Sequence, residues 1–131
     1  MLTAHTVRLY RAQLSSADES ERCGRAAFAV RHLGEMRLLI TATGDLDATN
    51  ARALGRFVER HTGVSKQLVL DLSDVEFFGT EGFAALHYVS VHCARHDVDW
   101  LFIAGRTVRR IVAICDPDAE LPLADGLAAA L

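Results

Sequence analysis

Two short, almost continuously apolar runs constrain the fold of this chain more than any other feature. The sequence KQLVLDL occupies residues 66–72, and VDWLFIAG occupies residues 98–105. Such runs are typical of strands that are covered on both faces or buried within a parallel sheet. The residues between the two runs have helical periodicity, as a crossover between parallel strands requires. The sequence therefore predicts an α/β fold with a mainly parallel core sheet.

The flanking segments extend this pattern of strands and helices. Residues 26–32 (AAFAVRH) and 36–47 (MRLLITATGDLD) predict a hairpin, because a turn signal separates them and apolar residues alternate in the second. Apolar positions at helical spacing predict helices near residues 50–62, 80–96 and 106–116, the first ended by Gly63 and the third by Pro117. Residues 121–131 predict a short extended piece and a final short helix.

Length and composition limit the domain organisation and the function class. A chain of 131 residues is expected to form one domain. Residues 1–24 are polar and mixed, so we expect an N-terminal extension, flexible or loosely attached, before a domain at residues 25–131. A net charge of −3 with scattered basic residues gives no footprint for nucleic acid, and no run approaches the ~20 apolar residues of a membrane span.

Cysteine usage and the N-terminal sequence predict the compartment. The three cysteines are an odd number without CxxC spacing, which fits reduced thiols better than a disulfide framework. The first residues lack the continuous apolar region of a secretory signal. We therefore expect a cytoplasmic protein, and the sequence does not determine its oligomeric state.

The segment VEFFGTEGFAAL at residues 75–86 places a carboxylate between two apolar elements. Glu81 falls where a helix should begin, and the first N–H groups of a helix carry partial positive charge. A carboxylate in the first turn contributes about 0.3–1 kcal/mol when exposed. Thr80 is a candidate N-cap, because its hydroxyl can accept from an N–H two or three residues on.

Three segments, in order over residues 26–131, resemble the STAS domain family of bacterial anti-sigma factor antagonists. The first is GDLDATNA, in which Gly44, Leu46 and Asp47 match the family segment. The second is LVLDLSDVEFFGTEGFAAL, and the third is AGRTVRRIVAICDPDAELPLADGLAAAL. In the second segment the matching positions are Asp71, Leu72, Ser73, Val75, Phe77, Gly82 and Phe83.

The resemblance implies a fold, a partner and a binding face. The fold would be a STAS fold, with a mixed, mainly parallel sheet of four to five strands and helices packed largely on one face. The partner would be an anti-sigma factor of the histidine-kinase-like ATPase type, whose capture frees a sigma factor, with no catalysis and no cofactor in this chain. The implied binding face comprises Asp47, Thr49, Asn50, Phe78, Gly79, Thr80, Glu81, Gly82, Phe83 and Arg106.

The sequence departs from the family pattern at the phosphoacceptor. In phosphorylated members of the family, a residue with a hydroxyl group stands just before the glycine. In this sequence Glu81 occupies that position. Three interpretations stay open: Glu81 imitates the phosphorylated state, or the partner surface is adapted to it and binds independently of phosphorylation, or it is only a suitable first-turn residue. Thr80 is either a helix cap or a phosphosite.

Other residues of the implied face also have structural alternatives. Asp47, Thr49 and Asn50 fit both the partner face and the capping of the first long helix. Phe78 and Phe83 would be binding hot spots if exposed, and the apolar pattern favours a core position for Phe83.

Two further pairs could carry chemistry. Cys93 and Cys115 fall on the apolar faces of two predicted helices, and a redox-responsive disulfide would need their α-carbons within ~7 Å. His92 and His96 lie one helical turn apart, but Cys93 stands where a zinc protease has its glutamate. We therefore predict no metal site.

Alternative functions are a scaffold or small-ligand module of the same fold, and an enzyme of flavodoxin or receiver type. The ligand module would show an apolar pocket beside the Thr80 loop. A receiver would need an acidic pair after its first strand, and AAFAVRH supplies none. No phosphate-binding glycine loop and no nucleophile elbow is present, which leaves protein binding as the favoured function.

Overall fold

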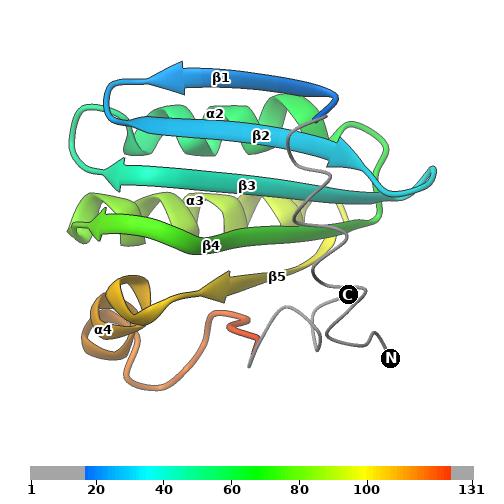
Figure 1. Cartoon of the computed structure of the whole chain (residues 1–131). Coiled ribbons are helices and arrows are strands. Elements are labelled where there is room, and N and C mark those ends of the chain that lie inside the picture. Colours follow the sequence, from blue (N-terminus) through cyan, green and yellow to red (C-terminus); the bar gives the residue numbers. More distant parts are fainter. Residues whose placement is uncertain (1–16, 125–131) are drawn as a thin grey trace, which may run out of the picture.

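The computed structural model describes residues 17–124, which form five strands and three helices (Figure 1). These elements confirm the predicted order of hairpin, helix, strand, helix, strand and helix. They are β1 (Glu19–Cys23), β2 (Ala26–His32), β3 (Arg37–Leu46), α2 (Ala51–Thr62), β4 (Gln67–Phe78), α3 (Thr80–Arg95), β5 (Asp99–Ala104) and α4 (Arg106–Cys115).

The strands form one mixed sheet in the order β1-β2-β3-β4-β5. β1, β2 and β3 pair antiparallel, whereas β3, β4 and β5 pair parallel. Helices α2 and α3 make the two parallel crossovers and lie side by side behind the sheet in Figure 1. The predicted α/β class is confirmed, with parallel pairing confined to the last three strands.

Strand β4 is longer than the sequence predicts. The apolar run that predicts this strand ends at residue 72, but β4 continues to Phe78. Its second half pairs with residues 43–46 of β3 through two register shifts, one between Thr41 and Thr43 and one between Gly44 and Asp45. Each bulge breaks the alternation of apolar residues, and this is why periodicity alone places the end of the strand too early.

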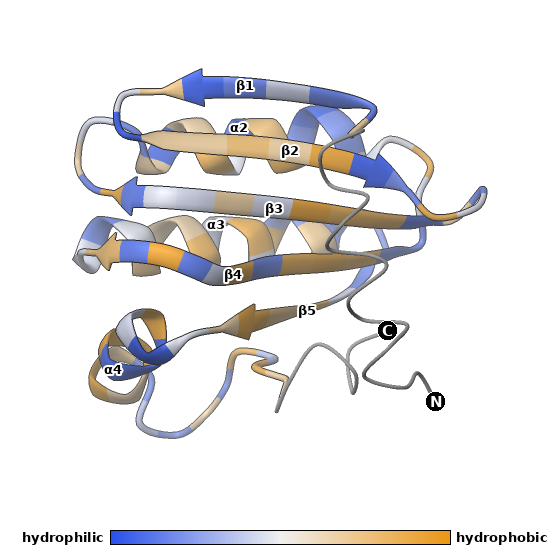
Figure 2. Ribbon diagram, in the orientation of Figure 1, coloured by the Kyte–Doolittle hydropathy of each residue, from blue (hydrophilic) through white to orange (hydrophobic). Residues whose placement is uncertain are grey.

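The predicted extension is corrected at residues 19–23, which form β1 at the edge of the sheet. Most of this strand is exposed, and Figure 2 shows it as largely hydrophilic. An ion pair of Glu21 with Arg60 (3.0 Å) and a contact of Glu19 with Nε2 of His61 (2.8 Å) connect β1 to α2. An edge strand held by backbone pairing and charge leaves no apolar signal in the sequence. Residues 1–16 of the predicted extension and the final short helix predicted within residues 121–131 lie outside the described residues.

The main core fills the space between the sheet and the helices. Alternate strand residues face it, such as Phe28 of β2, Ile40 of β3, Leu70 of β4 and Phe102 of β5, all fully buried. Phe57 of α2 packs on Phe28 with ring centroids 5.7 Å apart. Intervening positions form a smaller cluster on the opposite sheet face, composed of Leu39, Val69 and Ile103. Within residues 17–124, no helix combines the length and hydropathy that a bilayer crossing requires.

Candidate functional site

Two loops meet at the carboxyl ends of the parallel strands. One follows β3 and leads into α2, and the other follows β4 and leads into α3 (Figure 1). The N–H of Gly79 donates to the carbonyl of Leu46 at 3.1 Å, which ties the end of one loop to the start of the other. Because both helices begin at this edge, their positive N-terminal ends lie on the same side of the molecule.

The start of α3 differs from the sequence prediction in one respect. Gly79, in extended backbone, is the residue before the helix, and Thr80 is the first helical residue without a side-chain capping hydrogen bond. Thr80 is therefore not the N-cap. It is exposed, so its hydroxyl is accessible. A Cβ atom at position 79 would stand 2.6 Å from Oε2 of Glu81, which is the flexible end of that side chain.

Glu81 lies in the first turn of α3 and is exposed. Its side chain turns back towards Gly79, as the close approach of Oε2 indicates. The unpaired N–H groups of the helix end favour a negative charge at this place. The carboxylate is thus a negative group on the surface at the point where the two loops meet.

The two phenylalanines before Gly79 have opposite environments. Phe78 is only 2% exposed and packs in the core, so it is not available as the surface contact that the sequence analysis considered. Phe77 is 52% exposed and forms apolar surface beside Gly79. A Cβ atom built at Gly79 would stand 3.6 Å from Cε1 of Phe77. Phe77 is not among the face residues predicted from the sequence, because bulges in the pairing of β3 with β4 decide which of the two side chains points outwards.

The prediction that Phe83 belongs to the core is partly confirmed. Phe83 is half-buried and packs against the main core, as the helical pattern predicts. Gly82 is buried, and a Cβ atom there would stand 2.5 Å from Cε1 of Phe78. Gly82 is therefore a packing residue beneath the face and makes no surface contact.

The loop at residues 47–50 is held by its own side chains. Oδ1 of Asp47 accepts from the backbone N–H of Thr49 at 2.9 Å and from its hydroxyl at 2.5 Å, and these bonds lower the pKa of Asp47. Thr49 is exposed and Asp47 half-buried, so both can contribute to a surface.

Asn50 is corrected from a partner contact to a structural residue. It is only 1% exposed, and its amide donates to the carbonyls of Asp45 at 2.8 Å and Cys23 at 3.1 Å. Its Oδ1 accepts from the N–H of Asp47 at 3.0 Å. These bonds fix the loop to the ends of β1 and β3, and none of them caps α2.

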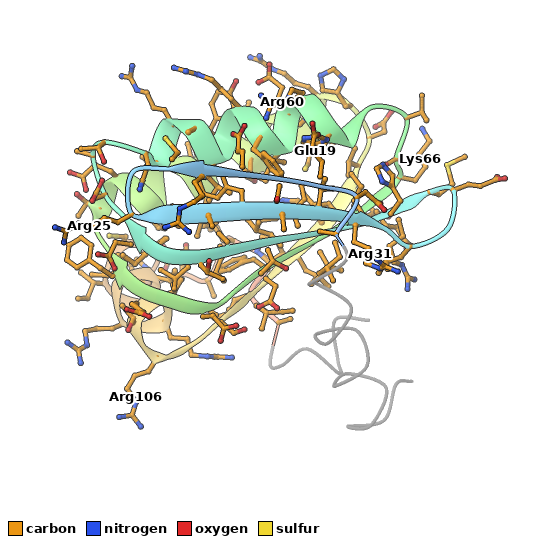
Figure 3. The ribbon with its side chains drawn as sticks, turned by 45° about the horizontal axis from the view of Figure 1, so that its top comes forward. Glu19, Arg25, Arg31, Arg60, Lys66 and Arg106 are labelled. Carbon is orange, nitrogen blue, oxygen red and sulfur yellow. The ribbon has the colours of Figure 1, made fainter. Side chains whose placement is uncertain are left out.

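Arg106 is exposed at the start of α4 and extends into solvent, as Figure 3 shows. Helix α4 also begins at the carboxyl edge of the sheet. Its first turn approaches β4 closely, because a Cβ atom at Gly105 would stand 2.6 Å from the carbonyl oxygen of Ser73. Arg106 lies beyond β4 and β5 and is not among the residues that line the groove described next.

A groove of about 740 Å³ runs between α2 and α3 from the site. Glu81 lines it at the start of α3, and Arg52, Arg56 and Tyr88 line it further along the two helices. The remaining lining residues are small: Ala48, Ala51, Gly55, Ala84 and Ala85. An apolar hollow beside the Thr80 loop is the feature that the small-ligand alternative predicted.

The cysteine and histidine pairs noted in the sequence form neither a disulfide nor a metal-binding group within residues 17–124. Cys93 is buried, Cys115 is half-buried, and both are free thiols. His92 contacts the hydroxyl of Thr62 at 2.8 Å through Nε2, and its ring lies 4.5 Å from that of His96. Among residues 17–124 no group of three or more side chains is placed to hold a metal ion.

Comparison with known proteins identifies the family. The model of the STAS domain family matches residues 27–130 of this chain. The chain therefore belongs to the STAS domain family. Its five-stranded mixed sheet and its helices agree with the fold of solved members.

Solved structures and one curated relative support this assignment. An anti-sigma factor antagonist from Mycobacterium paratuberculosis is 24% identical with a TM-score of 0.65, covering 78% of this chain and 87% of that one. The unphosphorylated anti-sigma factor antagonist SpoIIAA is 11% identical with a TM-score of 0.62, covering 74% and 87%. Osmosensory protein A of Mycobacterium tuberculosis is 27% identical over 86 residues, which are 65% of this chain and 54% of that protein. The matched region thus spans about half of that relative.

Proposed function

We propose that this chain is an anti-sigma factor antagonist that binds its partner independently of phosphorylation. The partner is an anti-sigma factor of the kinase-like ATPase type in the cytoplasm, and its capture frees a sigma factor. The chain itself performs no catalysis and needs no cofactor. Membership of the STAS family supports the proposal, as does the similarity in fold to two anti-sigma factor antagonists.

The observation that carries the proposal is the exposed carboxylate of Glu81 in the first turn of α3. By the family resemblance this is the position of the phosphoacceptor. A carboxylate lacks the hydroxyl group that is phosphorylated in other members of the family, so the site carries a negative charge that does not depend on a kinase. A phosphoserine would bring a charge of about −1.5 to −2 and three acceptor oxygens.

The surroundings of Glu81 favour a partner surface that is adapted to the carboxylate over a state in which Glu81 imitates phosphate and weakens binding. Phe77 offers exposed aromatic surface beside the carboxylate, and buried aromatic anchors dominate many interfaces. Asp47 and Thr49 form an internally bonded loop next to it, which costs little entropy to order on binding. We propose a partner surface that pairs a basic group with Glu81 and packs apolar side chains on Phe77.

The test compares wild type with Glu81→Gln, Glu81→Asp and Glu81→Ser in calorimetric titrations against each purified kinase-like anti-sigma factor of the source organism. Wild type is expected to bind one of them. Glu81→Gln should weaken that complex about 10-fold, because a charged pair is lost. Glu81→Asp keeps the charge and should retain most of the affinity of wild type. Tighter binding of Glu81→Gln would instead indicate that Glu81 imitates phosphate.

Phosphorylation is tested separately with ATP, Mg²⁺ and the same anti-sigma factor. Intact-mass spectrometry should find wild type unmodified and Glu81→Ser phosphorylated, because only the variant has a hydroxyl at the family position. A phosphoryl group on Thr80 of wild type would contradict independence from phosphorylation. Absence of binding to every anti-sigma factor would remove the proposed function itself.

The groove between α2 and α3 favours a second candidate function, the binding of a small ligand. Its volume of about 740 Å³ falls in the range of about 300–1,000 Å³ that is usual for ligand pockets. Native mass spectrometry of the protein purified from its own cells would detect such a ligand. A stoichiometric small molecule would favour this candidate, and an unliganded mass would count against it.

A further inference from the structure

The groove between α2 and α3 is continuous with the proposed binding face, because Glu81 belongs to both. Along α2 the groove reaches from Ala51 to Arg56, and along α3 it reaches from Glu81 to Tyr88. At 3.6 residues per turn these stretches correspond to about one and a half turns of α2 and about two turns of α3. The groove can thus accommodate a segment of regular structure rather than a single side chain.

The floor of the groove has no large side chains. Its residues are alanines and Gly55, so an approaching segment would pack close to the backbones of both helices. The space at Gly55 is used by Tyr88, since a Cβ atom there would stand 2.9 Å from Cδ1 of the tyrosine ring. The hydroxyl of Tyr88 donates to Glu59, and this contact holds the ring against α2 at the far end of the groove.

The walls of the groove carry an ordered set of charges. Arg52 and Arg56 are exposed, lie one helical turn apart on α2, and make no hydrogen bond or salt bridge with another residue in the range 17–124. Glu81 supplies a negative charge at the end where α3 begins. A complementary partner would therefore carry carboxylates opposite the arginines and a basic group opposite Glu81.

We infer that this groove receives an amphipathic α-helix of the anti-sigma factor, with two carboxylates one turn apart facing Arg52 and Arg56 and small apolar side chains on the alanine floor. Carboxylates at positions i and i+4 of a helix have the same spacing as the two arginines. The inference rests on the proposed function and names the part of the partner that is bound. A small ligand fits the observations less well, because both arginines on the wall of the groove are exposed.

Two substitutions test the groove without touching the core. Arg56→Glu reverses one charge of the wall, and Ala84→Leu fills the floor at an exposed position of α3. Arg110→Glu is the control for the first, because Arg110 is an exposed arginine within α4. Ala94→Leu is the control for the second, because Ala94 is exposed on α3 outside the groove. Circular dichroism and thermal unfolding verify that all four variants fold.

The measurement is the affinity of each variant for the anti-sigma factor that binds wild type. We expect Arg56→Glu and Ala84→Leu each to weaken binding about 30-fold or more, with both controls within about threefold of wild type. Hydrogen exchange on the complex should protect a helix of the anti-sigma factor that carries two carboxylates one turn apart. Replacing only the carboxylate that faces position 56 by lysine should restore binding to Arg56→Glu, because the other carboxylate still faces Arg52.

The failures of the inference and of the proposed function are distinguishable. If both groove variants bind like wild type while Phe77→Ala weakens the complex, the groove assignment is overturned and the proposed function stands. If wild type binds no anti-sigma factor, both are overturned. If both groove variants bind the anti-sigma factor normally, and a small molecule carried by wild type is lost from Ala84→Leu, the occupant is that ligand and the helix assignment is overturned.

Discussion

The ring of Phe78 lies directly over Gly82, so that a Cβ atom built at Gly82 would stand 2.5 Å from Cε1 and 2.7 Å from Cδ1 of the ring. This contact joins the last residue of β4 to the first turn of α3. It buries the aromatic ring while the adjacent Glu81 stays on the surface. The close packing of Gly82 against the ring of Phe78 thus keeps Phe78 in the core and leaves Glu81 on the surface.

The first prediction follows from this contact. Gly82→Ala should lower the free energy of unfolding by about 1–3 kcal/mol, because the ring or the helix must move to accept the methyl group. The gain in helix propensity, about 1 kcal/mol, offsets only part of this loss. Urea denaturation measures the change. Gly79→Ala is the control, since its methyl group would meet only the flexible end of Glu81, and equal stability losses in both variants would contradict the packing argument.

The second prediction separates the two neighbouring phenylalanines. Phe78→Ala should destabilise the fold by about 3–5 kcal/mol, because the ring is a buried part of the main core. Phe77→Ala should leave the urea midpoint nearly unchanged and weaken binding of the anti-sigma factor at least about 10-fold. The two variants remove the same side chain one residue apart, so each controls for the other. Normal binding by Phe77→Ala would exclude Phe77 from the interface.

The third prediction concerns the dependence of stability on pH. Burial lowers the pKa of His61 below its usual 6.5 although Glu19 opposes the shift, and burial together with His96 lowers the pKa of His92. The unfolded chain then binds protons more readily than the folded one. The two neutral imidazoles therefore make their full contribution to the free energy of unfolding above pH 6.5. That contribution decreases as the pH falls towards the lowered pKa values of the folded protein.

Replacement of both histidines tests this assignment. His61→Gln/His92→Gln should unfold with a flatter dependence of the free energy on pH between about 7.5 and 5 than wild type. The carboxylate of Asp18 accepts hydrogen bonds from the backbone N–H and Nδ1 of His32, and these lower the pKa of Asp18 below 3.8, so Asp18 titrates in more acidic solution. His87→Gln, at an exposed position of α3, is the control. An unchanged slope in the double variant would show that other groups cause the dependence.

The fourth prediction concerns thiol chemistry. Burial raises the pKa of the Cys93 thiol from 9.0 to about 11, so about 100-fold less thiolate is available at neutral pH. A colorimetric thiol reagent should modify the half-buried Cys115 well before Cys93. Cys115→Ala should remove part of the fast reaction, and Cys93→Ala should leave it unchanged. A disulfide between Cys93 and Cys115 after mild oxidation would contradict this order of reactivity.

The strands and helices of the domain were largely predictable from the sequence. Period-two alternation in β3, continuous apolar runs in β4 and β5, and helical spacing in α2, α3 and α4 each reflect burial on one or both faces. Burial selects apolar residues locally, and therefore leaves a local pattern. Strand β1 left none, because the ion pair of Glu21 with Arg60 of α2 and backbone pairing with β2 hold it at the edge.

The site was predictable as a region but not residue by residue. The order of motifs placed Glu81 and the loop at residues 47–50 together, because loops after parallel strands share one edge of the sheet. The roles of Asn50, Phe77 and Phe78 depend on which side of the backbone each side chain takes. Two bulges between β3 and β4 determine that choice at the end of β4, and their positions are set by pairing between distant strands.

The family, the order of the elements and the negative charge at the start of α3 are all readable from the sequence, because they depend on residue type and local spacing. The exposure of Phe77, the burial of Asn50 and the groove that Arg52 and Arg56 line with Glu81 depend instead on long-range packing. The physical reason is that a groove forms from the packing of two helices brought together by the sheet. No segment of the chain encodes that contact alone.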